Sequence, residues 1–259
     1  MRHLVVLSAV IALVALMPAG PAAADNGDKL SAVPFEFVGA AGDCGTGYAA
    51  GSRIVTAAWL GGMGLPDNGG QNSNPANPTD NPNKNDPHSG LLLSKNGPTP
   101  DCSSSGARIN GVKGLQVTAT FELGFDYRNG GHCGAGAPRF NVTTTSGFSF
   151  AGGCSNGVRS AAPQDPAQWT RVRIFATLAG QGFPPIPVGS VIESISIVYD
   201  EGTDTVLADD AMGIGLVVID NIDIGGKVIT SGPSGKDNKD KKDKKDKGDG
   251  DDNDQGDDD

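Results

Sequence analysis

Side chains that can bind a ligand gather in one short stretch of the chain, Leu115–Phe140. Within it, Arg128 and His132 carry N–H groups that donate hydrogen bonds, and Tyr127 offers an aromatic face for stacking. The Gly-rich sequence NGGHCGAGAPR surrounds His132, and such a composition favours a turn. The stretch therefore predicts a binding site formed by Tyr127, Arg128 and His132.

The same stretch also has an architectural interpretation. An ion pair from Asp126 to an arginine, together with a disulfide at Cys133, would hold the turn without any ligand. His132 does not indicate zinc, because the only other histidine after residue 24 is His88, in a low-complexity segment. At the level of sequence, the binding and the architectural interpretations both stay open.

The carboxylates give little support to catalysis. After residue 24 the chain has four glutamates, and no two are close in sequence: Glu36, Glu122, Glu193 and Glu201. Many β-sandwich glycosidases instead place their acidic residues in a compact cluster. The sequence GFSFA at 147–151 has Ala where a serine-hydrolase elbow has its second Gly. We therefore predict a protein that is not an enzyme and requires no cofactor.

The two ends of the chain predict export and a charged tail. Residues 1–24 combine a basic start, an apolar run and Ala22–Ala24, which is typical of a signal peptide cleaved before Asp25. Residues 231–259 are rich in Lys and Asp, almost without apolar side chains, and predict disorder. The formal net charge of −10 argues against nucleic acid as a partner, and no later stretch predicts a membrane span.

An even set of cysteines in an exported protein favours disulfides. We expect Cys133–Cys154, because the segments between them have the pattern of a hairpin that brings its ends together. The remaining pair would then be Cys44–Cys102. A zinc ion held by all four cysteines is disfavoured, because the chain has no C-x-x-C pair.

Residues 25–230 predict one all-β domain, an antiparallel jelly-roll-like β-sandwich. Apolar and polar residues alternate along Leu115–Tyr127, which is typical of a strand with one buried face and one solvent-exposed face. Residues 66–90, rich in Asn, Pro and Gly, predict a low-complexity loop. The other expected strands are 35–38, 54–60, 91–94, 139–144, 147–151, 169–176, 191–199, 214–224 and 227–230.

Five segments in order carry a resemblance to a known family: TFELGFDYR, PRFNVTT, QWTRVRIFA, IESISIVYDEG and GLVVIDNIDIGG. Over Gly114–Thr230 the chain resembles the galactose-binding-like jelly-roll domains found among carbohydrate-binding modules. The resemblance implies a fold more than a function, because one fold hosts many functions. It also implies a structural calcium ion between Glu36 and Asp220, with carbonyl oxygens completing the shell. Without calcium, Asp220 is simply a polar residue of an alternating strand.

Two functions follow as hypotheses, with a secreted hydrolase or lyase as a third. The first is a secreted, non-catalytic β-sandwich that binds glycan or another extracellular polymer, such as a cell-wall polysaccharide. The second is a structural protein of the cell exterior with no specific ligand. A sugar platform needs at least two exposed aromatic rings side by side. The candidates are Trp59, Trp169, Tyr48, Tyr127 and Tyr199.

Overall fold

The computed structural model describes residues 29–40, 43, 54–65, 88–95, 102–201 and 215–232. The predicted signal peptide, nearly all of the 66–90 loop and most of the 231–259 tail lie outside these residues. Cys44 and Tyr48 also lie outside the described residues.

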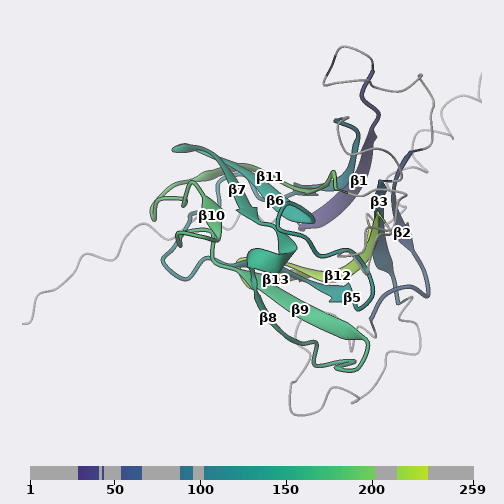
Figure 1. The fold of residues 1–259 in the computed structure, drawn as a ribbon. Coiled ribbons are helices and arrows are strands. Elements are labelled where there is room, and N and C mark those ends of the chain that lie inside the picture. Colours follow the sequence, from purple (N-terminus) through teal and green to yellow (C-terminus); the bar gives the residue numbers. More distant parts are fainter. Residues whose placement is uncertain are drawn as a thin grey trace, which may run out of the picture.

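The fold is a β-sandwich of two antiparallel sheets, as the sequence predicts (Figure 1). The first sheet has the order β1-β4-β11-β6-β7-β10, and the second has β2-β3-β12-β5-β9-β8, with β13 pairing β12. This architecture is compatible with a jelly-roll-like fold. The strands of the first sheet are β1 (Ser31–Phe37), β4 (Ser104–Asn110), β6 (Arg139–Thr144), β7 (Gly147–Gly152), β10 (Gly182–Phe183) and β11 (Ile192–Tyr199).

The second sheet contains the longest strand, β12, near its centre. Its strands are β2 (Val55–Leu60), β3 (Gly90–Lys95), β5 (Leu123–Arg128), β8 (Val158–Ala161), β9 (Trp169–Ile174), β12 (Leu216–Ile224) and β13 (Lys227–Ile229). The described residues contain one helical turn, the 3₁₀ segment Cys154–Asn156, and no α-helix. No helix in this part of the chain is long and apolar enough to cross a membrane.

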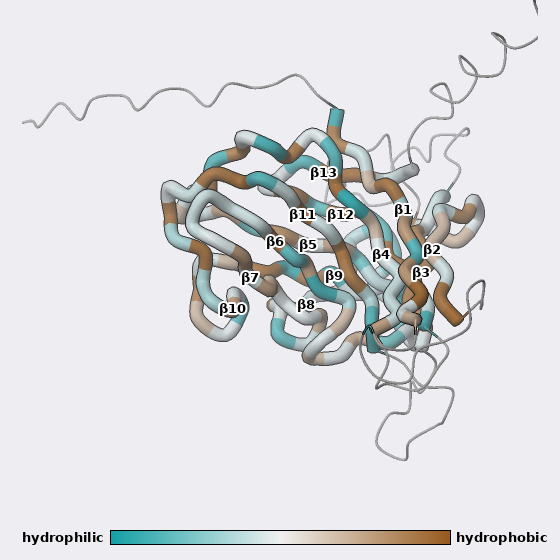
Figure 2. Tube along the Cα trace, turned by 90° about the horizontal axis from the view of Figure 1, so that it is seen from above, coloured by the Kyte–Doolittle hydropathy of each residue, from teal (hydrophilic) through white to brown (hydrophobic). Residues whose placement is uncertain are grey.

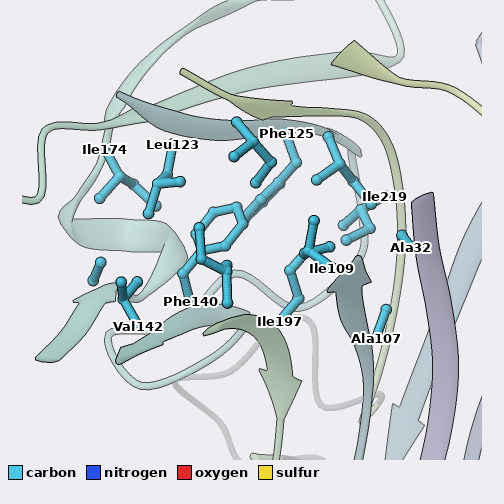
Figure 3. Close-up of a cluster of buried hydrophobic side chains, with 14 of the residues drawn as sticks. Ala32, Ala107, Ile109, Leu123, Phe125, Phe140, Val142, Ile174, Ile197 and Ile219 are labelled. Atoms are coloured by element: carbon cyan, nitrogen blue, oxygen red, sulfur yellow. The ribbon is translucent and has the colours of Figure 1, made fainter. Parts of the chain in front are cut away.

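The core lies between the sheets and follows from the period-two alternation of the strands. Phe125 of β5 meets Phe140 of β6 from the opposite sheet, with ring centroids 5.9 Å apart (Figure 3). Ile174, Ile197 and Ile219 surround them and are fully buried. Each such side chain contributes about 1.5–3 kcal/mol when removed from water, so the facing rows of apolar residues account for the pairing of the two layers.

The prediction of one long strand over Leu115–Tyr127 is wrong for the first half of that range. Only Leu123–Arg128 forms a strand, β5 of the second sheet. Leu115 and Val117 instead exchange backbone hydrogen bonds with Ile192, Ser190 and Gly189, beside β11 of the first sheet. The chain crosses between the layers in the intervening residues, and the alternation persists because Val117 and Phe121 still face the core.

Three strands have no counterpart in the sequence prediction: β4, β8 and β10. β4, sequence SSGARIN, is rich in residues typical of turns, yet it lies inside the first sheet between β1 and β11. Its Gly106 is required by close packing: a Cβ there would meet the Phe35 ring at 2.5 Å and also overlap the Ile197 carbonyl. Packing against neighbours therefore overrides the local preference of this segment.

The predicted hairpin and disulfide are confirmed. β6 and β7 pair from Arg139↔Gly152 to Thr144↔Gly147, and Cys133 is bonded to Cys154 with a Cα–Cα distance of 5.0 Å. Cys102 is also in a disulfide, and its expected partner, Cys44, lies outside the described residues. The bridge at Cys133 therefore anchors the Gly-rich turn to the end of β7.

Candidate functional site

The three residues of the predicted site point in different directions. Tyr127 is buried in the core between the sheets, whereas Arg128, its neighbour in β5, is exposed on the other face. His132 is half-buried, packs edge-on against Tyr199 at 5.8 Å, and its Nε2 lies 3.1 Å from Oε2 of Glu201. The structure therefore does not bring Tyr127, Arg128 and His132 together in one surface.

The Gly-rich turn around His132 is tied to the end of β11 by charged groups. Arg139 makes a bidentate ion pair with Asp200, at 2.6 and 2.7 Å, and its Nη1 also donates to the Gly136 carbonyl. Glu201 Oε2 accepts from the backbone N–H of Ala137 as well as contacting His132. These contacts satisfy the charges within the fold, which agrees with the architectural interpretation of the turn.

Asp126 does pair with an arginine, but its partner lies outside the predicted stretch. Arg171 of β9 donates to both carboxylate oxygens, at 2.8 and 2.9 Å, and Asn221 of β12 donates to Oδ2 at 2.7 Å. The hydrogen bond to Asp126 raises the pKa of Arg171. Asp126 lies on the outward face of β5, yet it is buried. This face of the second sheet is therefore not uniformly exposed to solvent, although the alternation suggested that it would be.

The two residues of the predicted calcium site accept hydrogen bonds from different segments. Glu36 is exposed and accepts from the Ala57 backbone N–H at 2.9 Å. Asp220 is fully buried and accepts from the backbone N–H groups of Leu65 and Asn221, each at 2.7 Å. Calcium takes six to eight oxygen ligands, and the described residues contain no group of three or more His, Cys, Asp or Glu side chains that suits a metal ion. The calcium site stays a prediction.

The aromatic residues named as platform candidates are mostly enclosed. Trp169, Tyr127 and Tyr199 are buried, and Trp59 is half-buried with its indole N–H donating to the Ala32 carbonyl at 2.9 Å. Tyr48 lies outside the described residues. The described members of this set therefore pack within the fold and do not form a surface for sugar rings.

A different set of aromatic rings is exposed side by side. Phe148 and Phe150 of β7 are 46% and 42% exposed, and their ring centroids are 4.8 Å apart at an interplanar angle of 88°. Phe183 of β10, directly opposite Phe150 in the ladder, is 44% exposed. Arg139 lies over the Phe150 ring, with Cζ 5.2 Å from its centroid. We call Phe148, Phe150 and Phe183 the aromatic platform.

The aromatic platform belongs to the outer face of the first sheet, because Phe148 and Phe150 alternate with the buried Ser149 and Ala151. The strands β6, β7 and β11 of this sheet are labelled in Figure 2. The register places one residue from each of the six strands in a transverse row, and residues directly opposite each other point to the same face. From β1 to β10 this row is Val33, Arg108, Ser196, Asn141, Phe150 and Phe183. The face therefore places polar and charged groups beside the aromatic rings.

Sequence reasoning missed the aromatic platform, because the sequence pattern of β7 is that of a core strand. In GFSFA the small residues Ser149 and Ala151 alternate with phenylalanines, and they are buried while the phenylalanines are exposed. A strand normally buries its larger apolar residues, so the aromatic residues of such a pattern are assigned to the core. Ser149 is accommodated inside because its hydroxyl donates to the Pro184 carbonyl at 2.6 Å.

Comparisons with protein families, with curated proteins and with solved structures found no match to this chain.

Proposed function

We propose that the protein is an exported, non-catalytic β-sandwich that binds an extracellular polysaccharide, with the aromatic platform as the contact surface. The two-sheet fold is compatible with that of galactose-binding-like jelly-roll domains, a resemblance that bears on the fold more than on the function. Export is supported by the Cys133–Cys154 disulfide, since such bonds persist in oxidising compartments.

The observation that carries the proposal is the exposure of three phenylalanines on neighbouring strands. Exposed large apolar side chains grouped together mark interaction sites more often than isolated ones do. Phenylalanine rings offer apolar surface, which suits the C–H groups of sugar rings, and here the Phe148 and Phe150 rings lie perpendicular to each other with Arg139 over Phe150. Asn141 of β6, opposite Phe150, is half-buried and adds an amide beside the ring. A mixed aromatic and amide surface fits a ligand that is itself both apolar and hydroxylated.

The second candidate function is a structural protein of the cell exterior with no specific ligand. The contacts around His132 and Asp126 favour it, because the polar groups there are satisfied within the fold. It differs from the binding proposal in one respect that an experiment can measure: a pure scaffold gives the aromatic platform no ligand.

The test is affinity electrophoresis of the full chain through native gels that contain one soluble polysaccharide each, both neutral and acidic. The test variant is Phe148→Ala/Phe150→Ala. The control is Phe37→Ala. Phe37 is 45% exposed and lies on β1, the strand at the opposite edge of the same sheet. All three substituted side chains are similarly exposed, so both variants should fold.

We expect at least one polysaccharide to retard the native chain and Phe37→Ala equally, and to retard the double variant much less. Loss of both aromatic rings should weaken the affinity at least tenfold, if each ring contributes about 1 kcal/mol. If no polysaccharide retards the native chain, or if the double variant is retarded as strongly, the proposal is wrong.

A further inference from the structure

A groove of about 380 Å³ opens on the first sheet beside β4 and β11. It falls within the size range of small-ligand sites. The turn after β4 closes one side. The polar and charged residues that line it are Arg108, Asn110, Lys113, Glu193, Ser194 and Ser196.

The arrangement of β1 and β4 positions Arg108 within this groove. The side chain of Arg108 lies over the Phe35 ring of β1, with Cζ 5.4 Å from the ring centroid. Phe35 in turn lies against Gly106, directly opposite it in the ladder, where any side chain would collide with the ring. A cation over an aromatic face is attracted by the negative charge of the ring's face. Gly106, Phe35 and Arg108 thus form a stack that places an exposed guanidinium at the groove.

The charge of Arg108 is not neutralised by a carboxylate of the described residues. The neighbouring arginine on the same face, Arg139, is held by Asp200 in a bidentate pair. Arg108 and Lys113 have no ion pair with any residue in the described ranges, nor does Glu193. The groove therefore carries two positive groups and one negative group, whereas the whole chain carries a net charge of −10.

Arg108 is aligned with the aromatic platform. Arg108, Ser196, Asn141 and Phe150 are successive members of the transverse row. Adjacent strands lie about 4.8 Å apart, so the Arg108 and Phe150 backbones are separated by about 14 Å along the row. An extended oligosaccharide of a few units can span this distance, with one end on the rings and the other at the groove.

We infer that the groove at Arg108 binds an anionic substituent, a carboxylate or a sulfate ester, of the polysaccharide that the aromatic platform holds. This inference rests on the proposed function. A guanidinium donates two parallel N–H groups that match the geometry of either oxyanion. Polar contacts from Ser196 and Asn110 are available beside it. The polymer class is therefore an acidic polysaccharide.

The experiment compares pairs of polymers that share a backbone and differ in charge. Affinity electrophoresis of the full chain uses polygalacturonate against its methyl-esterified form for the carboxylate, and dextran sulfate against dextran for the sulfate. The test variant is Arg108→Gln. The control is Arg159→Gln, at an exposed arginine of β8 in the other sheet.

We expect the native chain and Arg159→Gln to prefer the charged member of at least one pair, and Arg108→Gln to lose about tenfold or more in affinity for it, as expected for a charged hydrogen bond. The preference should also weaken as salt is raised. The pair that shows the preference identifies the substituent. If Arg159→Gln loses as much affinity for the charged polymer as Arg108→Gln does, the attraction is non-specific and the inference is overturned.

The outcomes separate this inference from the proposed function. If the platform variant Phe148→Ala/Phe150→Ala abolishes binding while Arg108→Gln binds both members of each pair as the native chain does, the binding function stands and the acidic preference is wrong. If Arg108→Gln loses the acidic polymer while the platform variant keeps it, the groove stands and the aromatic platform is wrong. If the native chain binds none of the polymers, both are wrong.

Discussion

Asp126→Asn is the substitution with the best-defined cost in this structure. The Asp126 carboxylate is 1% exposed and receives three hydrogen bonds, two from Arg171 and one from Asn221. Asparagine has nearly the same shape but only one acceptor oxygen and no charge. The change therefore leaves the packing volume intact and leaves the Arg171 guanidinium without its counter-charge.

Removing one partner of a buried ion pair costs about 3–5 kcal/mol. The Arg171 side chain is 22% exposed, so water can solvate part of the charge that is left behind, and the cost should lie near the lower limit. We expect Asp126→Asn to reduce the free energy of unfolding by about 3 kcal/mol. This is a large share of the roughly 5–15 kcal/mol that stabilises a typical domain.

The measurement is equilibrium urea unfolding of the full chain at neutral pH, followed by tryptophan fluorescence. Trp169 is buried on β9, the strand that carries Arg171, so it reports on this part of the sheet. Glu122→Gln supplies the matched control. Glu122 pairs with Arg173 of the same strand at 3.7 Å, and that arginine is 48% exposed. Because Arg173 is this exposed and the two charged atoms are 3.7 Å apart, the pair contributes about 0–1 kcal/mol.

The two substitutions should therefore differ by at least about 2 kcal/mol in unfolding free energy. A loss below about 1 kcal/mol for Asp126→Asn, or a loss equal to that of Glu122→Gln, would refute the reasoning that burial makes the Asp126–Arg171 pair costly to break.

Three further outcomes are expected in urea unfolding. Cys133→Ser/Cys154→Ser, which removes a disulfide across 21 residues, should cost about 3 kcal/mol, and an unchanged midpoint would contradict this. Burial, and to a smaller extent Glu122, raises the pKa of Asp223 above its ordinary 3.8. The folded chain thus holds this proton more tightly than the unfolded chain, and ionisation destabilises the fold as pH rises through the raised pKa. Asp223→Asn should therefore be more stable than the native chain at pH 7, with a difference that shrinks towards pH 4; a difference independent of pH would argue against it. Asp220→Ala should lower the free energy of unfolding by the same amount with and without calcium, because the carboxylate accepts hydrogen bonds from two backbone N–H groups. A loss of stability seen only with calcium would support the metal prediction instead.

The fold class could be predicted because alternation along strands records which face meets the core. Leu123, Phe125 and Tyr127 are buried as their spacing predicts. Strand limits were harder to predict, because alternation does not reveal which sheet a residue joins. Val117 and Phe125 share one pattern, yet their segments pair with different sheets. β4 was not predicted, because its Gly106 is required by the close approach of Phe35 and the Ile197 carbonyl. This close approach exists only in the assembled sheet.

The site could be predicted less well than the fold. The stretch Leu115–Phe140 contains charged residues, but Asp126 and Arg139 are paired with Arg171 and Asp200, both distant in sequence. Such pairs depend on strand order, which a single sequence does not specify. The exposed phenylalanines were missed for the opposite reason: their pattern is that of a core strand, and only the assembled sheet shows that Ser149 faces inward.

The crossing of the chain between the sheets has a consequence for how the domain opens. The residues from Leu115 to Leu123 are hydrogen-bonded beside β11 at one end and continue into β5 at the other. A short covalent segment thus ties the two layers together, and neither layer can move away without breaking backbone pairing. Amide protons of β11 and β5 should therefore exchange with solvent in one cooperative event, at a common rate under conditions where exchange requires unfolding.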